Sequence, residues 1–403
     1  MTNDLPKQRI KDFYILAALR QPSGQAQVYL VTESGLSIYK SYWLRFLINL
    51  QCLSLTAAQR YRIMVLKLTR QERNALDIHT EVELLKKLQH THLAQLTSTK
   101  NSLPIRYHDQ YFITLKYECG GSLLDLWQAK KQRFTPVQAV QVGYQISQVL
   151  NYLHQQWSVA HNDVSMDNIM LREPLSIWRK KQPHYVLIDL AAAQDKLQFS
   201  RLGRERYQPP EYLDPRLHSF AQGDLVDLYS MGMLLYLLLG GKHQLQQEHG
   251  GASKSKEAWV QLKESLPPIN TINPMISEQL NSLIMDALEP TPNRRRYKFG
   301  SEQLMNSFLQ RIQQVPEFQQ SGVIKRPIPS WVYVMLISSL LITFLAGWLI
   351  VALINRPPVT LNPISIAATV TPIPTNTALP IPATTVRIPT IEPTSTFVPS
   401  PTP

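Results

Sequence analysis

The stretch VAHNDVSMDNIML, residues 159–171, decides the fold. It follows an apolar helical pattern that ends at His154, and it holds Asp163 and Asn168 between two apolar ends. A carboxylate and an amide oxygen in a short polar loop can orient a hydroxyl group and bind a divalent cation. The apolar flanks favour a functional loop over an accidental polar turn.

Three charged residues elsewhere complete a set that phosphoryl transfer requires. The apolar pattern at 64–66 ends in Lys67, a helical pattern opens near Glu81, and the apolar run at 186–188 ends in Asp189. Phosphoryl transfer needs a lysine on the nucleotide phosphates, oxygen ligands for magnesium and a carboxylate that orients the attacking hydroxyl. The sequence supplies one candidate for each part.

Over residues 12–310 these motifs resemble, in order, those of the eukaryotic-type Ser/Thr protein kinases. The chain is identified as a degenerate member of that family, of the bacterial type with a C-terminal transmembrane helix. The resemblance implies an α+β, two-lobed fold with ATP and Mg²⁺ as cofactors. It implies the roles of five residues: proton acceptor Asp163, phosphate-binding Lys67, its partner Glu81, and metal ligands Asn168 and Asp189. Glu83, about 200° away on a helix, is the alternative partner of Lys67.

Two segments resemble the nucleotide-contacting elements of the family. Residues 21–29 align with the glycine loop, but Gly24 alone survives, out of register. Close approach of backbone to phosphate favours glycine, so ATP binding is weakened rather than excluded. Residues 115–123 resemble the hinge between the lobes, although two adjacent glycines also mark an ordinary turn. Besides Lys67, the resemblance implies that the nucleotide contacts Ser23, Gly24, Val28, Tyr117 and Cys119.

Three C-terminal motifs belong to protein kinases in particular. Residues 203–211 resemble G-T-x-x-Y-x-A-P-E, and 227–232 match D-x-Y-S-x-G, whose aspartate, Asp227, braces the catalytic loop. Residues 290–296 resemble the terminal arginine motif. The resemblance implies that one arginine pairs with Glu211, and the sequence leaves three candidates open: Arg294, Arg295 and Arg296.

The catalytic motifs depart from the family at five positions. Asn162 replaces the arginine of H-R-D, Ser165 replaces the catalytic-loop lysine, and D-F-G has become D-L-A. The resemblance implies that the missing H-R-D arginine would dock a phosphorylated residue, and residues 189–211 contain no threonine, with Arg204 at the threonine of G-T. Activation by loop phosphorylation is therefore not expected. Without the lysine, charge that develops in the transition state is less well neutralised.

Two insertions interrupt the family pattern. Residues 32–60 include the apolar stretch Tyr42–Ile48, which either pads the small lobe or contacts a partner or the membrane. The basic segment Trp178–Lys181 forms either a solvated turn or a contact with acidic lipid headgroups. Padding and a solvated turn are the simpler expectations.

Five segments follow from these patterns: an N-lobe at 1–118, a C-lobe at 119–312, a juxtamembrane linker at 313–330, a transmembrane helix at 331–354 and a disordered tail at 355–403. The span has 24 residues without a charge, which is long enough to cross a bilayer, and no polar face typical of a core helix. Residues 1–20 lack the apolar core of a secretory signal.

The flanks of the span predict its orientation. Arg311, Lys325 and Arg326 precede it and Arg356 follows, which predicts a cytoplasmic kinase domain in a single-pass protein of the cell membrane. From residue 357 onward there are 12 prolines and 11 threonines, a composition typical of an extended, disordered stalk. The stalk either carries glycans or a cell-wall contact, or it is an inert spacer.

The net charge of +12 fits a membrane protein with a cytoplasmic face, and no basic stripe with interleaved aromatics indicates nucleic acid. The sequence therefore predicts a membrane-anchored Ser/Thr protein kinase with cytoplasmic protein substrates, the lipid bilayer as a partner, and a dimer as a further option. A pseudokinase scaffold with little turnover is the alternative. A small-molecule phosphotransferase ranks last, because 210–211 and 227–232 match protein kinases.

Overall fold

The computed structural model describes residues 9–19, 26–33, 43–44, 46–48, 54–69, 75–97, 104–129, 134–175, 182–198, 204–240, 255–300, 303–320, 338 and 345. The chain divides into two units, Met1–Ser330 and Trp331–Pro403, and the described helices and strands belong to the first. Several predictions lie outside the described residues: Ser23, Gly24, the segment 178–181, the tail, and the predicted span apart from Ser338 and Leu345. None of the described helices has the length and apolar character needed to cross a membrane.

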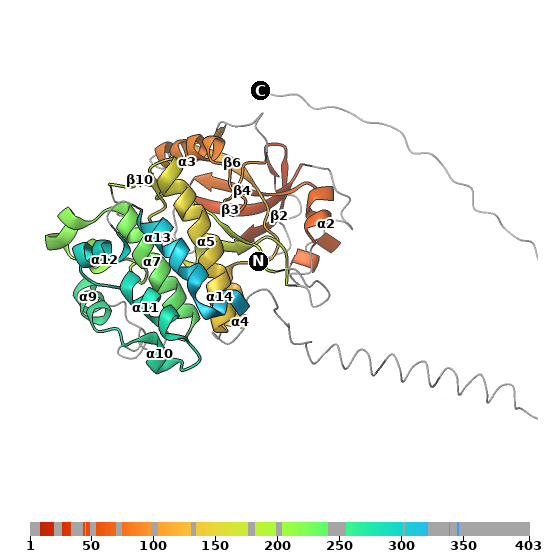
Figure 1. Ribbon diagram of the computed structural model, residues 1–403. Helices are drawn as coiled ribbons and strands as arrows, with labels where there is room; N and C mark the ends of the chain where they lie inside the picture. The colour runs from red at the N-terminus through yellow and green to blue at the C-terminus, as the bar shows by residue number, and fades with distance from the viewer. Residues whose placement is uncertain are drawn as a thin grey trace, which may run out of the picture. The chain divides into compact units, whose positions relative to one another are not determined.

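An antiparallel sheet of six strands forms the N-terminal lobe, in the order β1-β2-β3-β4-β6-β5 (Figure 1). Its strands are β1 (Arg9–Ile10), β2 (Phe13–Leu19), β3 (Ala26–Thr32), β4 (Ile63–Thr69), β5 (Ile105–Tyr107) and β6 (Gln110–Lys116). Helix α3 (Ala75–Lys87) packs against β6. This lobe matches the strand-rich half that the sequence predicts.

Strand β4 positions the lysine of the site. Leu66 and Leu68 belong to an apolar cluster on one face of the sheet, whereas Ile63 belongs to a cluster on the other. Because successive side chains of a strand alternate between faces, Lys67 shares the face of Ile63. Burial of the leucines therefore fixes the direction of the lysine.

The described part of the 32–60 insertion packs on this sheet. Ser54 caps helix α2 (Leu55–Arg60) by accepting a hydrogen bond from the Ala57 amide at 3.2 Å. Leu44 and Ala58 are buried in one cluster with Leu30 and Ile63 of the sheet. These contacts support the view that the insertion pads the small lobe.

Helices dominate the C-terminal lobe. Among the residues that the structure describes, these are α4 (Leu123–Ala129), α5 (Pro136–Gln156), α6 (Pro210–Leu213), α7 (Gly223–Leu238), α9 (Lys256–Glu264), α10 (Ile269–Ile272), α11 (Glu278–Ala287), α12 (Pro292–Phe299), α13 (Leu304–Gln314) and α14 (Pro316–Gln319), together with the 3₁₀ turns η3 (Met166–Asn168) and η4 (Pro215–Phe220). Short strands pair as β7 (Val159–Ala160) with β10 (Gln194–Asp195), and β8 (Ile169–Leu171) with β9 (Tyr185–Leu187).

Helices α5 and α7 form the centre of this lobe, with α11 and α13 against them (Figure 1). Helix α5 begins at a capping box between Thr135 and Gln138, and Pro136 occupies its first turn. Every residue of α7 is buried, as expected for a helix that is apolar nearly all round. The sequence predicts a start for α7 at Asp227, one turn late, because its first turn contains Gly223 and Asp224.

Candidate functional site

Lys67 joins three elements that lie far apart in the sequence. Its Nζ atom is 2.7 Å from Glu81 Oε2 on α3 and 2.7 Å from Asp189 Oδ1, which follows β9. Val28 of β3 is the direct cross-strand partner of Lys67, so the predicted nucleotide contact lies beside the lysine. The structure therefore brings Lys67, Glu81, Asp189 and Val28 together.

Helix α3 presents one of its two candidate glutamates to the site. Glu81 is almost fully buried between the apolar residues Ile78 and Val82 of the same helix. Glu83 points to solvent and pairs with Lys86 at 2.7 Å. The pattern of apolar residues on α3 thus selects Glu81 as the partner of Lys67.

The electrostatics of this cluster keep the lysine charged. Burial alone opposes the ammonium form, but the two carboxylates raise the pKa of Lys67 overall. Burial also raises the pKa of Glu81, whereas at Asp189 the lysine outweighs burial and lowers the pKa. A cation paired with Asp189 in this way is ready to bind phosphate oxygens.

The catalytic loop holds Asp163 next to Asn168. The Asn168 side-chain amide donates to the Asp163 carboxylate at 2.7 Å and to the Asp163 carbonyl at 2.9 Å. The buried Asp227 carboxylate accepts from the amides of His161 and Asn162, both at 2.8 Å. Asn162 adopts φ +63°, a conformation that asparagine tolerates better than most residues. Asp227 braces the loop as the sequence predicts.

Asp163 has the features of a proton acceptor. Burial is the largest influence on this carboxyl group and raises its pKa, against the Arg204 charge and the Asn168 hydrogen bond. One of its oxygens, Oδ1, has no hydrogen-bond partner among the described residues. A carboxylate with a raised pKa and an unused oxygen can take a proton from a hydroxyl group.

The oxygen donors fit magnesium. Asp189 adopts φ +69° at the turn after β9, and the Ala191 amide donates to its Oδ1 at 3.2 Å. Mg²⁺ binds through one or two carboxylates together with substrate phosphates, rather than in a cage made wholly of protein. Asp189 and Asn168 supply such donors, and no cluster of three metal-binding side chains occurs within the described part of the chain.

The predicted hinge residues lie between the two lobes. Tyr117 and Cys119 do follow β6, between the lobes, but the Cys119 amide donates to the carbonyl of Arg172 at 3.2 Å. That amide is thus engaged within the protein, and the contact of Cys119 with adenine stays a prediction. Burial raises the pKa of the Cys119 thiol to about 12, which keeps it protonated and inert. The contact of Tyr117 with adenine stays a prediction.

Buried side chains hold α6 and the residues just before it in place. Arg295, among the three candidate arginines, pairs with Glu211, and both side chains are fully buried. The buried Lys263 of α9 donates to the backbone carbonyls of Glu205 and Gln208. Sequence patterns do not single out Lys263, because its position on α9 carries no motif.

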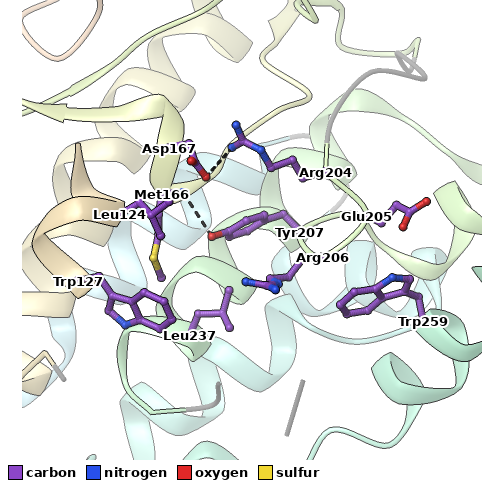
Figure 2. A pocket seen from close by; sticks show the side chains of 10 residues that line it. All are labelled: Leu124, Trp127, Met166, Asp167, Arg204, Glu205, Arg206, Tyr207, Leu237 and Trp259. Atoms are coloured by element: carbon purple, nitrogen blue, oxygen red, sulfur yellow. Dashed lines mark hydrogen bonds and ion pairs between the residues drawn. The ribbon is translucent and has the colours of Figure 1, made fainter. Parts of the chain in front are cut away.

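A pocket of about 330 Å³ opens beside the catalytic loop (Figure 2). Asp167 and Arg204 form an ion pair of 2.9 Å at one side of it, and the Tyr207 hydroxyl accepts from the Met166 amide at 3.4 Å. The lining comes from α4, the loop, 204–207, α7 and α9: Leu124, Trp127, Met166, Asp167, Arg204, Glu205, Arg206, Tyr207, Leu237 and Trp259.

Comparison with known proteins agrees with this geometry. A family model described as "Protein kinase domain" matches residues 50–308. The chain is 30% identical to serine/threonine-protein kinase ULK3 of Xenopus laevis over 226 residues, which cover 54% of this chain and 42% of that protein. It is 28% identical to calcium/calmodulin-dependent protein kinase cmkA of Emericella nidulans, with 43% and 39% covered, and 29% identical to an Aurora kinase of Yarrowia lipolytica, with 47% and 46% covered. The chain spans less than half the length of these relatives.

Proposed function

Because the chain belongs to the protein kinase domain family, we propose that it transfers the γ-phosphate of ATP to serine or threonine hydroxyls of other proteins. The observation that carries this proposal is the position of Lys67. It contacts Glu81 and Asp189 at once, each at 2.7 Å, although 122 residues separate it from Asp189. Such convergence is what phosphoryl transfer requires, since its catalysis depends mainly on positioning and charge.

Each residue of the site has a role in this reaction. Lys67 binds phosphate oxygens of ATP, and Glu81 holds the lysine in place. Asp189 and Asn168 would hold Mg²⁺, which would supply positive charge at the phosphates. Asp163 orients the attacking hydroxyl and accepts its proton, and its partner Asn168 keeps it in place.

The pocket beside the catalytic loop suits a substrate chain. It combines apolar side chains, such as Trp127 and Leu237, with charged ones at its rim. It adjoins Met166 and Asp167, which follow Asp163 closely in the loop. A protein segment seated in this pocket would bring a neighbouring hydroxyl toward Asp163.

The direct test is transfer of labelled phosphate by the purified full chain. With Mg²⁺ and γ-labelled ATP, the wild type should label itself or a generic protein substrate. Asp163→Asn should abolish the signal, while Asp109→Asn, at an exposed carboxylate on the β5–β6 turn, should keep it. Equal labelling by the wild type and Asp163→Asn would disprove the proposal.

A pseudokinase is the second candidate, because Ser165 removes a phosphate-binding cation and residues 21–29 keep one glycine. Such a protein would bind ATP without turnover. Thermal unfolding measured with and without Mg-ATP, together with the labelling assay, separates the two: stabilisation without labelling supports the pseudokinase.

We also propose that residues 331–354 anchor the chain in the cell membrane with the kinase domain in the cytoplasm. The support is the charge-free stretch of 24 residues and the excess of basic residues before it. Reporter fusions at residues 320 and 403 should give cytoplasmic and extracytoplasmic signals, respectively. The same signal from both fusions would contradict a single span.

A further inference from the structure

Ser165 leaves the catalytic loop without a cation of its own, yet a cation lies against it. The Arg204 guanidinium donates through Nη1 to Ser165 Oγ and forms an ion pair with Asp167 Oδ2 at 2.9 Å. In the described part of the chain, this is the one ion pair that reaches residues 161–168. Arg204 therefore places a positive charge where Ser165 cannot.

The contacts of Arg204 leave part of its guanidinium unused. The contacts with Ser165 and Asp167 both involve Nη1, and no partner of Nε or Nη2 occurs among the described residues. Guanidinium groups carry five N–H donors in a fixed plane and bind phosphate oxygens in pairs. The side chain is about 25% exposed, so these donors can reach a ligand at the loop.

The backbone holds Arg204 firmly in this position. Its carbonyl accepts from the amides of Tyr207 at 2.8 Å and Gln208 at 3.3 Å. Lys263 fastens the same segment through the Glu205 carbonyl at 2.6 Å. Figure 2 shows Arg204 and Arg206 on opposite sides of the Tyr207 ring, with Arg204 on the side of Asp167. Donors fixed in advance cost no reorganisation during a reaction, which is the basis of electrostatic catalysis.

The charge of Arg204 also acts on the proposed proton acceptor. Burial is the main influence on the Asp163 pKa and raises it, and Arg204 is foremost among the groups that oppose this rise. The geometric contacts of Arg204 are with Ser165 and Asp167, which follow Asp163 in the same loop. The hydrogen bond to Ser165 and the ion pair with Asp167 do not depend on this influence on the Asp163 pKa, and they agree with it.

We propose that Arg204 replaces the missing catalytic-loop lysine: its guanidinium reaches across Ser165 and contacts the γ-phosphate of ATP beside Asp163. The inference rests on the proposed phosphotransfer function. Two substitutions would then compensate each other, the loss of a cation at Ser165 and the gain of one at Arg204. The site would remain competent for catalysis despite its departure from the family pattern.

The test combines three variants of the full chain with two measurements. Arg204→Met removes the charge, Arg216→Met removes a control arginine that is 88% exposed and paired with Asp214, and Ser165→Lys/Arg204→Thr returns the cation to the loop. The measurements are kcat for transfer with labelled Mg-ATP, and the ratio of ATP to ADP affinity by calorimetry. Thermal unfolding of each variant shows whether it is folded.

Arg204→Met should lower kcat about 10²-fold, the usual effect of removing one donor to a transition-state charge. It should lower the ATP/ADP affinity ratio about tenfold, as expected for a charged hydrogen bond to the γ-phosphate. Arg216→Met should change neither, and the double variant should restore most of both.

Two outcomes would overturn the inference: an Arg204→Met variant that keeps the wild-type affinity ratio, or a folded double variant that restores neither quantity. If the wild type itself shows no transfer, the proposed function fails. In that case the ratio of ATP to ADP affinity still shows whether Arg204 contacts the γ-phosphate.

Discussion

Replacing Glu81 by glutamine removes one of the two carboxylates that hold Lys67 while keeping the size of the side chain. At 2.7 Å, the attraction between Glu81 and Lys67 is about 6 kcal/mol in a medium of effective dielectric constant 20. Much of this is offset, because burial of the Glu81 carboxylate is itself costly. We expect a net loss of about 3 kcal/mol in the positioning of Lys67, because Asp189 still holds the ammonium group.

The consequence is a lysine that moves toward Asp189. A loss of about 3 kcal/mol in the transition state corresponds to a kcat roughly 10²-fold lower. Stability should fall less, since the buried charge disappears together with its partner contact. The assay is transfer of labelled phosphate at saturating Mg-ATP, with thermal unfolding measured in parallel.

The matched control is Glu83→Gln on the same helix, which breaks the exposed pair with Lys86. It should leave kcat within about twofold of the wild type, because exposed pairs contribute little. If Glu81→Gln keeps the wild-type kcat, or if both variants lose activity equally, then the position of Lys67 does not depend on Glu81 and the reasoning is refuted.

Three further outcomes follow from the structure. Arg295→Met leaves the Glu211 carboxylate buried and unpaired, so the free energy of unfolding measured in urea should fall by about 3–5 kcal/mol, and a change below about 1 kcal/mol would contradict a buried pair. Burial lowers the pKa of His92 to about 4, from an ordinary value near 6.5, so the folded state favours the neutral imidazole. The free energy of unfolding should therefore fall as the pH falls from about 6.5 toward 4. The His92→Gln variant should lose less melting temperature than the wild type over that range. Removal of divalent ions with a chelator should abolish phosphate transfer and weaken ATP binding measured by calorimetry. The reason is that the Asp189 carboxylate then faces the phosphates without a metal. Unchanged ATP binding would argue against Asp189 as a metal ligand.

Sequence patterns predict the elements that carry the site more readily than its side-chain contacts. The alternation along β4 and the helical period of α3 select the faces on which Lys67 and Glu81 lie, because burial of apolar neighbours enforces those faces. The same patterns do not predict which partner the charged end of a long side chain contacts. Arg295 is therefore one of three equal candidates in the sequence, and its pairing with Glu211 depends on how α12 packs.

In the sequence, Arg204 is only a departure from the family pattern, a residue in place of threonine. Its contact with Ser165 joins two substitutions that lie 39 positions apart, and no local pattern connects them. The hinge shows the same limit in another form. The sequence places Cys119 correctly after β6, but the pairing of its amide with Arg172 depends on the loop after β8. Contacts between distant loops require the fold.

The most direct test of the central claim is a crystal structure of the kinase domain within the full chain, bound to Mg²⁺ and a non-hydrolysable ATP analogue. Phosphate oxygens should contact Lys67 Nζ, and the metal should contact Asp189 and Asn168, with Asp163 facing the γ-phosphate. A nucleotide bound elsewhere, or a site where Lys67 keeps both carboxylates while the phosphates lie beyond its reach, would contradict the account.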